Sequence, residues 1–187
     1  IKKIILMPYR FASLAALPKL LMPSKKTQTV AVFVDAQNMY HSARNLYKAR
    51  VNFKELLKFA VAGRNLVKAN AYVIKSDIPE EQGFFEALER SGYYLKMKDL
   101  QIFPGGMKKA DWDVGIAIDA ISMIQKAEVM VFVTGDGDFI PLLEYLKHQG
   151  ITVEVIAFRR STSSKLIQSA DRFYDLEEEV DRFLLKK

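Results

Sequence analysis

The chain of 187 residues contains no cysteine and only two histidines, His41 and His148. The absence of cysteine excludes structural disulfides, cysteine-based zinc sites and thiol catalysis. The scarcity of histidine argues against a multi-histidine metal site and against a Ser/His/Asp triad. Metal chemistry in this protein would therefore need carboxylate ligands, which suit magnesium or manganese.

Several sequence signals of other protein classes are also missing. No Walker-type or Rossmann glycine motif follows a predicted strand, which argues against nucleotide hydrolysis and dinucleotide redox chemistry. A haloacid-dehalogenase-type phosphatase would need an aspartate two residues after its nucleophile, but Gln37 follows Asp35 at that spacing. No apolar run approaches the length of a transmembrane segment and nothing resembles a secretion signal, so we expect a cytoplasmic location.

The net charge of +6 is concentrated in residues 1–26, here called the leader. The leader has six basic residues and no acidic one, whereas the rest of the chain carries 22 basic and 22 acidic side chains. Pro8, Pro18 and Pro23 would interrupt a long helix there. Three interpretations stay open: a basic arm for RNA or a membrane surface, a segment that docks a protein partner, and a remnant of processing or cloning.

From residue 27 to 187 the pattern predicts one α/β domain. Apolar, β-branched runs alternate with amphipathic segments of helical length, which is typical of βαβ units around a central, mainly parallel sheet with helices on both faces. The expected strands are 29–35, 70–76, 93–98, 129–134, 151–158 and 172–176. The expected helices are 38–47, 53–63, 79–92, about 111–124, 139–149 and 163–170, followed by an acidic C-terminal helix.

Sheets of this kind bind ligands beyond the carboxyl ends of their strands, where the strand order reverses. The residues to inspect therefore follow the apolar strands directly. They are Asp35 after the first strand, Ser76 and Asp77 after the second, and Thr134 to Asp138 after the fourth.

Two of these strand ends carry acids whose burial would be costly without a cation or several hydrogen-bond donors. Asp35 ends the run TVAVFVD, and Asn38 follows at the start of a helix. Either residue could cap that helix, and we expect Asp35 to serve the site, whereas for Asn38 capping and a role in the site stay equally open. In TGDGDF, Asp136 and Asp138 flank a glycine that we expect to let the backbone approach a ligand. Thr134 is expected to make a local hydrogen bond more readily than a substrate contact.

A third acidic segment, KKADWDVGIAIDAISMI (108–124), predicts a mostly apolar helix. Asp113 falls in its first turn, and we expect it to face the metal, whereas Asp111 is expected to cap the helix. Asp119 is surrounded by apolar residues, so we expect a buried partner for it in preference to a place at the edge of the site.

Three motifs stand in order along the chain: FVDAQNMY, KKADWDVGIAIDA and VFVTGDGDFIPLLEYLKHQGITVEV. They are followed by SSKLIQSADRFYDL. With these motifs the chain from about residue 29 to 175 resembles NYN-domain proteins of the LabA-like group, which are related to PIN nucleases. The leader lies outside this resemblance.

The resemblance implies a three-layer, Rossmann-like fold with an acidic pocket that binds Mg²⁺ or Mn²⁺, and a ribonuclease activity. Carried over by motif position, Asp35, Asp113 and Asp136 would be the catalytic metal ligands. Asn38, Asp138 and Thr134 would support them.

Basic residues near the mouth of this pocket would bind the phosphates of RNA, most readily of single-stranded RNA. These residues are Lys108, Lys109 and Arg159, and the family shows a basic residue at the position of Lys109. The mechanism that we expect is metal-assisted hydrolysis of a phosphodiester.

A second hypothesis is that the chain has this fold but does not cleave RNA. The chain would then be a regulatory protein that binds RNA or a protein partner, with the leader and the predicted acidic helix (176–182) as docking elements. A small-molecule phosphatase is a third hypothesis, and the sequence also leaves open a homodimer.

Overall fold

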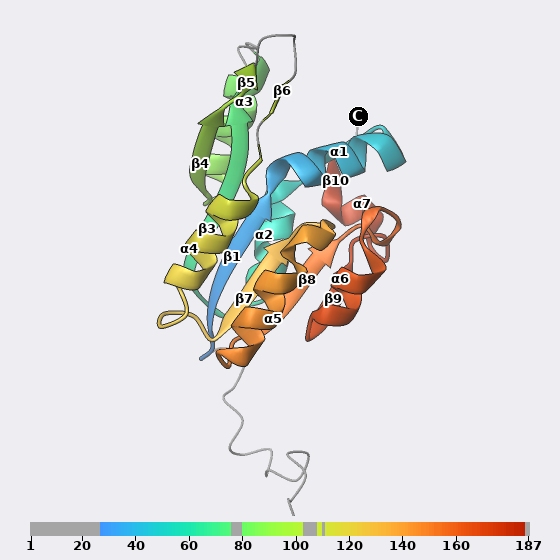
Figure 1. The fold of residues 1–187 in the computed structure, drawn as a ribbon. Helices are drawn as coiled ribbons and strands as arrows, with labels where there is room; N and C mark the ends of the chain where they lie inside the picture. Colours follow the sequence, from blue (N-terminus) through green and yellow to red (C-terminus); the bar gives the residue numbers. More distant parts are fainter. Residues whose placement is uncertain (1–26, 76–79, 103–107, 110, 186–187) are drawn as a thin grey trace, which may run out of the picture.

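The computed structural model describes residues 27–75, 80–102, 108–109 and 111–185, so the leader and the pair Ser76 and Asp77 lie outside the described residues. Six parallel strands form the central sheet in the order β4-β3-β1-β7-β8-β9 (Figure 1). Their bounds are β1 Thr29–Asp35, β3 Asn65–Lys75, β4 Tyr94–Asp99, β7 Val129–Val133, β8 Thr152–Ala157 and β9 Arg172–Asp175.

Helices cover both faces of this sheet. On one face pack α1 (Ala36–Tyr47), α2 (Phe53–Val61) and α3 (Glu80–Arg90), and on the other α4 (Asp113–Ser122), α5 (Ile140–His148) and α6 (Ser164–Ser169). The predicted three-layer α/β fold is confirmed. None of the helices in the described ranges combines the length and the apolar character needed to cross a membrane.

The alternation of side chains along β1 shows how one strand serves both faces. Val30, Val32 and Val34 belong to the core on the α1–α2–α3 face, whereas Ala31 and Phe33 belong to the core on the α4–α5–α6 face. Because β1 is central and buried on both sides, its sequence is apolar from Val30 to Val34.

The strand order reverses between β1 and β7. These strands are neighbours in register, with Val34 opposite Val133. From β1 the chain continues to β3 and β4 on one side of the pair, and from β7 it continues to β8 and β9 on the other side. The residues that directly follow β1 and β7 therefore meet at the carboxyl edge of the sheet, as the strand-end argument predicted.

Two segments differ from the prediction. Strand β3 starts at Asn65, five residues earlier than expected, because Thr29 and Val30 of β1 pair with Asn65 and Leu66. The first three of these residues are exposed, and the polar Asn65 and Lys68 interrupt the segment, so it lacks the continuous apolar run of a buried strand.

The predicted acidic C-terminal helix is wrong in its extent. Only α7 (Val180–Phe183) is helical, and β10 (Leu184–Leu185) then pairs antiparallel with β2 (Arg50–Val51). Phe183 is buried against the ring of Phe59, with ring centroids 5.2 Å apart. This packing and the pairing with β2 outweigh the local helix propensity.

The described part of the chain also contains a buried ion pair between Arg64, which follows α2, and Glu154 of β8. Arg64 Nη2 lies 2.9 Å from Glu154 Oε2, and their side chains are 5% and 1% exposed. Arg64 also donates to the carbonyl of Ala60, and Arg172 reaches the other carboxylate oxygen of Glu154 at 3.0 Å. The carboxylate is thus satisfied inside the core, and its partners link α2 to the β8–β9 edge of the sheet.

We predict that Glu154→Ala destabilises the fold by about 3–5 kcal/mol, because it leaves the Arg64 guanidinium buried without its counter-charge. Chemical denaturation measures this loss. The matched control is Glu86→Ala, which breaks the exposed pair with Arg90 and should cost about 0–1 kcal/mol. Equal losses in the two variants would contradict this role of Glu154.

Candidate carboxylate site

Asp35 is the last residue of β1 and the N-cap of α1. One of its carboxylate oxygens accepts the backbone N–H of Asn38 at 2.9 Å. The run of β-branched residues before it favours a strand, and its acceptor side chain favours a helix start directly afterwards. The cap is therefore Asp35, and the capping role considered for Asn38 is wrong.

Asn38 connects the first motif to the third. Its side-chain oxygen accepts the backbone N–H of Gly135 at 3.0 Å. This hydrogen bond joins the start of α1 to the loop after β7, which carries Asp136 and Asp138. Asn38 thus fixes the position of that loop through the backbone.

The loop after β7 is held by its own side chains. Thr134 is buried and accepts the N–H of Asp136 at 3.2 Å, which is the local hydrogen bond expected for it. Asp136 then accepts the N–H of Asp138 at 2.9 Å and caps the short 3-10 helix η3 (Gly137–Phe139).

Both glycines of this loop allow a close approach, but their close neighbours belong to the protein itself. A Cβ added at Gly135 would lie 2.6 Å from the carbonyl oxygen of Ser161, and one at Gly137 would lie 3.0 Å from the hydroxyl of Ser163. The close approach that we expected at Gly137 is therefore made to the segment after β8 and not to a ligand.

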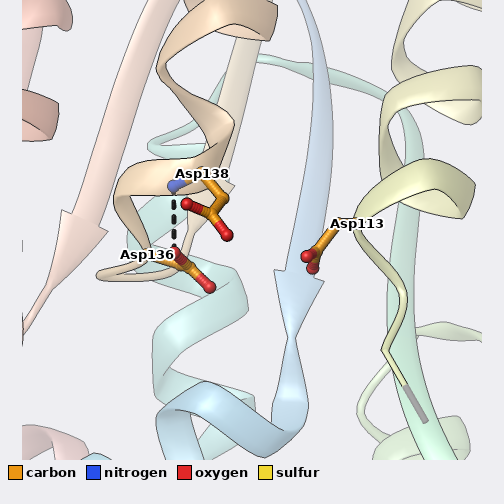
Figure 2. Close-up of side chains that lie close together, drawn as sticks. All are labelled: Asp113, Asp136 and Asp138. Carbon is orange, nitrogen blue, oxygen red and sulfur yellow. Dashed lines mark hydrogen bonds between the residues drawn. The ribbon is translucent and has the colours of Figure 1, made fainter. Parts of the chain in front are cut away.

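Asp113 comes to this loop from α4. It is the first residue of that helix, and one carboxylate oxygen from each of Asp113, Asp136 and Asp138 lies within 4.8 Å of the other two. Figure 2 shows the three side chains reaching toward one another from α4 and η3. Asp35 is close enough to Asp113 and Asp136 for their charges to raise its pKa.

The electrostatics are those of crowded carboxylates. The pKa of Asp35 is raised to about 6, mainly by burial and also by the charges of Asp113 and Asp136, although the N–H groups of Asn38 and Gln37 lower it. Burial also raises the pKa of Asp113, followed by the charges of Asp136, Asp111 and Asp138. A cation bound among these groups would relieve the repulsion.

The basic residues predicted to bind substrate lie in two different parts of the structure. Arg159 lies after β8, but its Nε is 2.7 Å from Asp175, so its charge is paired. The backbone of Lys108 and Lys109 forms β6, which pairs with β5 (Gln101–Ile102). Their side chains lie outside what the structure describes, so their role in binding substrate remains a prediction.

The two other aspartates of the second motif have different surroundings. The N-cap of α4 is Trp112, without a side-chain cap bond, so the capping role expected of Asp111 is wrong. Asp119 accepts the hydroxyl of Tyr72 at 2.9 Å and pairs with Lys96 at 3.2 Å. The buried partner expected for Asp119 is present.

Sequence reasoning missed two residues beside the site, Lys98 and Trp112. Lys98 Nζ lies 5.0 Å from the centre of the Trp112 ring, and the lysine charge lowers the pKa of Asp113. Trp112 directly precedes Asp113 in the second motif, a position that could have drawn attention to it. Lys98 ends a predicted strand on the far side of a loop, and nothing local in the sequence connects it to Asp113.

We predict that Asp35→Asn stabilises the metal-free protein at neutral pH. The folded pKa of about 6 lies above the ordinary value of 3.8, so the carboxyl contributes its full stability below pH 4 and loses it as the pH rises through 6. Asparagine keeps the helix cap and removes this loss, which is on the order of 3 kcal/mol. Denaturation of both proteins in chelator between pH 3.5 and 8 measures the difference.

The gain should disappear below about pH 4, where the wild-type carboxyl is protonated in both states. A variant that is less stable than wild type throughout this range would show that the carboxylate of Asp35 is not strained by its surroundings.

The comparisons with known proteins agree with this geometry. The model of the NYN domain matches residues 29–177. The chain is 25% identical over 162 residues to the low amplitude and bright protein LabA of Synechococcus elongatus, covering 79% of this chain and 83% of that protein.

A crystal structure of a protein of unknown function from Vibrio parahaemolyticus has the same fold, with a TM-score of 0.79 and 33% identity. It covers 88% of this chain and 100% of that chain. One family model thus matches most of the chain. The matched part contains the three motifs, the reversal of strand order and the converging aspartates. The chain belongs to the NYN domain family, a family of PIN-like nucleases.

Proposed function

We propose that this protein is a ribonuclease that hydrolyses RNA phosphodiesters with the help of Mg²⁺ or Mn²⁺ at the carboxylate site. The observation that carries this proposal is the convergence of Asp113, Asp136 and Asp138 within 4.8 Å at the edge where β1 and β7 end. Membership of the NYN family supports a nuclease-type activity.

The donor set fits a hard divalent cation. Carboxylate oxygens are the ligands that Mg²⁺ and Mn²⁺ prefer, and the described residues bring several of them to one place. Asp113, Asp136 and Asp138 would hold the ion, with Asp35 beside them. A divalent ion held by these carboxylates would lower the pKa of a water molecule and neutralise charge on the phosphate.

The chain's own residues prepare the site for this chemistry. Asp35 and Asp136 each accept a backbone N–H at 2.9 Å, so their carboxylates are held in place before substrate arrives. Asn38 and Thr134 position the loop after β7 through Gly135 and Asp136. Such fixed ligands avoid the cost of reorganisation during the reaction.

The negative charge of the carboxylate site also sets a requirement for the substrate. Four carboxylates repel a phosphodiester until a cation lies between them, so binding of RNA and of metal should depend on each other. Lys109 and Lys108 are proposed to bind phosphates on the side of the β5–β6 pair. Arg159 would contribute only by exchanging Asp175 for a phosphate.

We predict that the protein cleaves a labelled single-stranded RNA in manganese or magnesium and not in chelator. Asp136→Asn should lower the rate at least about a hundredfold, because the site loses a charged ligand. The matched control is Asp181→Asn, the same change at an exposed aspartate of α7 outside the carboxylate cluster, which should cleave like wild type. Gel analysis of the products measures both rates.

Equal cleavage by wild type and Asp136→Asn would contradict the proposal, since the activity would then belong to another site or to a contaminant. Cleavage that persists in chelator would contradict the metal requirement.

Metal binding is testable without cleavage. We predict that manganese raises the melting temperature of the wild-type protein, because it binds the folded state only. The increase should be much smaller in Asp113→Asn and unchanged in Asp181→Asn. Differential scanning calorimetry in chelator and in manganese measures it, and equal increases in all three proteins would place the metal elsewhere.

A further inference from the structure

Trp112 is the only tryptophan of the chain and lies directly before Asp113. Its indole N–H donates to the carbonyl of Val73 at 2.9 Å, and its ring packs on that of Tyr72 with centroids 5.4 Å apart. A Cβ added at Gly115 would lie 2.5 Å from the ring, so the helix has a glycine where the indole passes. These contacts fix the orientation of the ring, which remains partly exposed.

Lys98 supplies a cation beside this ring. Its ammonium lies 5.0 Å from the ring centre and donates to the carbonyl of Asp111 at 2.8 Å. The side chain is exposed and comes from the end of β4. The charge of Lys98 lowers the pKa of Asp113, so the ammonium lies near the carboxylates.

Two other basic residues of the sheet and its loops are paired with acids. Lys96 lies 3.2 Å from Asp119, and Arg159 lies 2.7 Å from Asp175. Within the described residues Lys98 instead bonds a backbone carbonyl, so no ion pair neutralises its charge. The lysine stem is flexible, and its ammonium can leave the ring for a phosphate.

A partly exposed, rigid indole and an available ammonium are the two groups that a nucleotide of a single strand needs. Bases stack on aromatic rings without regard to sequence, and the phosphate beside the base binds a cation. A base within a duplex presents its faces to its neighbours and is not free to stack on protein.

We propose that Trp112 and Lys98 form a nucleotide-binding subsite next to the carboxylates, where an unpaired base stacks on the indole and its phosphate binds the ammonium. This subsite rests on the proposed function and specifies its substrate as single-stranded RNA. It holds a nucleotide beside the one that is cleaved, and it takes no part in the chemistry itself.

The fluorescence of Trp112 tests the subsite directly, because no other tryptophan contributes. The wild-type protein is titrated in calcium with a short single-stranded RNA, with the duplex of the same sequence, and with a single strand that contains abasic positions. Polarisation of a label on each RNA measures binding, and a gel shows that the RNA stays intact. We expect the single strand to quench the emission of Trp112, and the duplex and the abasic strand to leave it nearly unchanged.

Variants separate stacking from structural support. Trp112→Phe keeps an aromatic face, and Trp112→Leu removes it, so the second should bind single-stranded RNA about tenfold more weakly than the first. Lys98→Ala should weaken binding and lower the slope of log affinity against log salt by about 0.7. The matched control is Lys126→Ala, at the other end of α4, which should bind like wild type. Circular dichroism verifies that each variant folds.

The outcomes distinguish this proposal from the proposed function. If the single strand binds or is cleaved while the emission of Trp112 does not change, the subsite is wrong and the nuclease stands. Equal quenching by the abasic strand would also contradict stacking. If single-stranded RNA neither binds in calcium nor is cleaved in manganese, the subsite and the proposed function are both wrong.

Discussion

The pairing of β1 with β7 is the constraint on which the rest of the structure depends. The two strands are buried on both faces of the sheet and pair in register up to Val34 and Val133. Their carboxyl ends therefore fix where Asp35 and the loop after Thr134 stand. The helices then cover the sheet from both sides, and α4 brings Asp113 to the same edge. A shift of one residue in this register would turn the apolar side chains of β1 from one core to the other.

Placing several carboxylates at this edge costs free energy, and the backbone offsets part of it. Asp35 and Asp136 accept N–H groups at the start of α1 and η3, where helix termini favour negative charge. These bonds do not remove the repulsion, because the pKa of Asp35 still rises to about 6. A cation bound at a site that is strained in this way would stabilise it, so metal binding would raise the stability of the fold.

The sequence predicted much of this arrangement for identifiable physical reasons. Continuous β-branched runs marked the buried strands, and the alternation with helices predicted a parallel sheet. Asp35 and Asp136 were found because an acid directly after a buried strand is costly without a partner. Asp113 was predicted from the second motif. The structure adds that α4 places it opposite η3.

What the sequence did not predict depends on contacts between distant segments. The first residues of β3, Asn65 to Val67, are exposed, and they form a strand because β1 lies beside them. The C-terminal segment has the composition of a helix, yet packing of Phe183 and pairing with β2 end the helix after one turn. The bond from Gly135 to Asn38 and the contact of Lys98 with Trp112 likewise join segments that only the fold brings together.

The central claim is that the aspartates in the loop after β7 and at the start of α4 bind a divalent metal beside Asp35. Anomalous scattering from crystals of the protein grown with manganese tests it most directly. The account predicts a manganese peak within bonding distance of the carboxylates of Asp113 and Asp136. Ordered carboxylates with no peak between them, at saturating manganese, would contradict it.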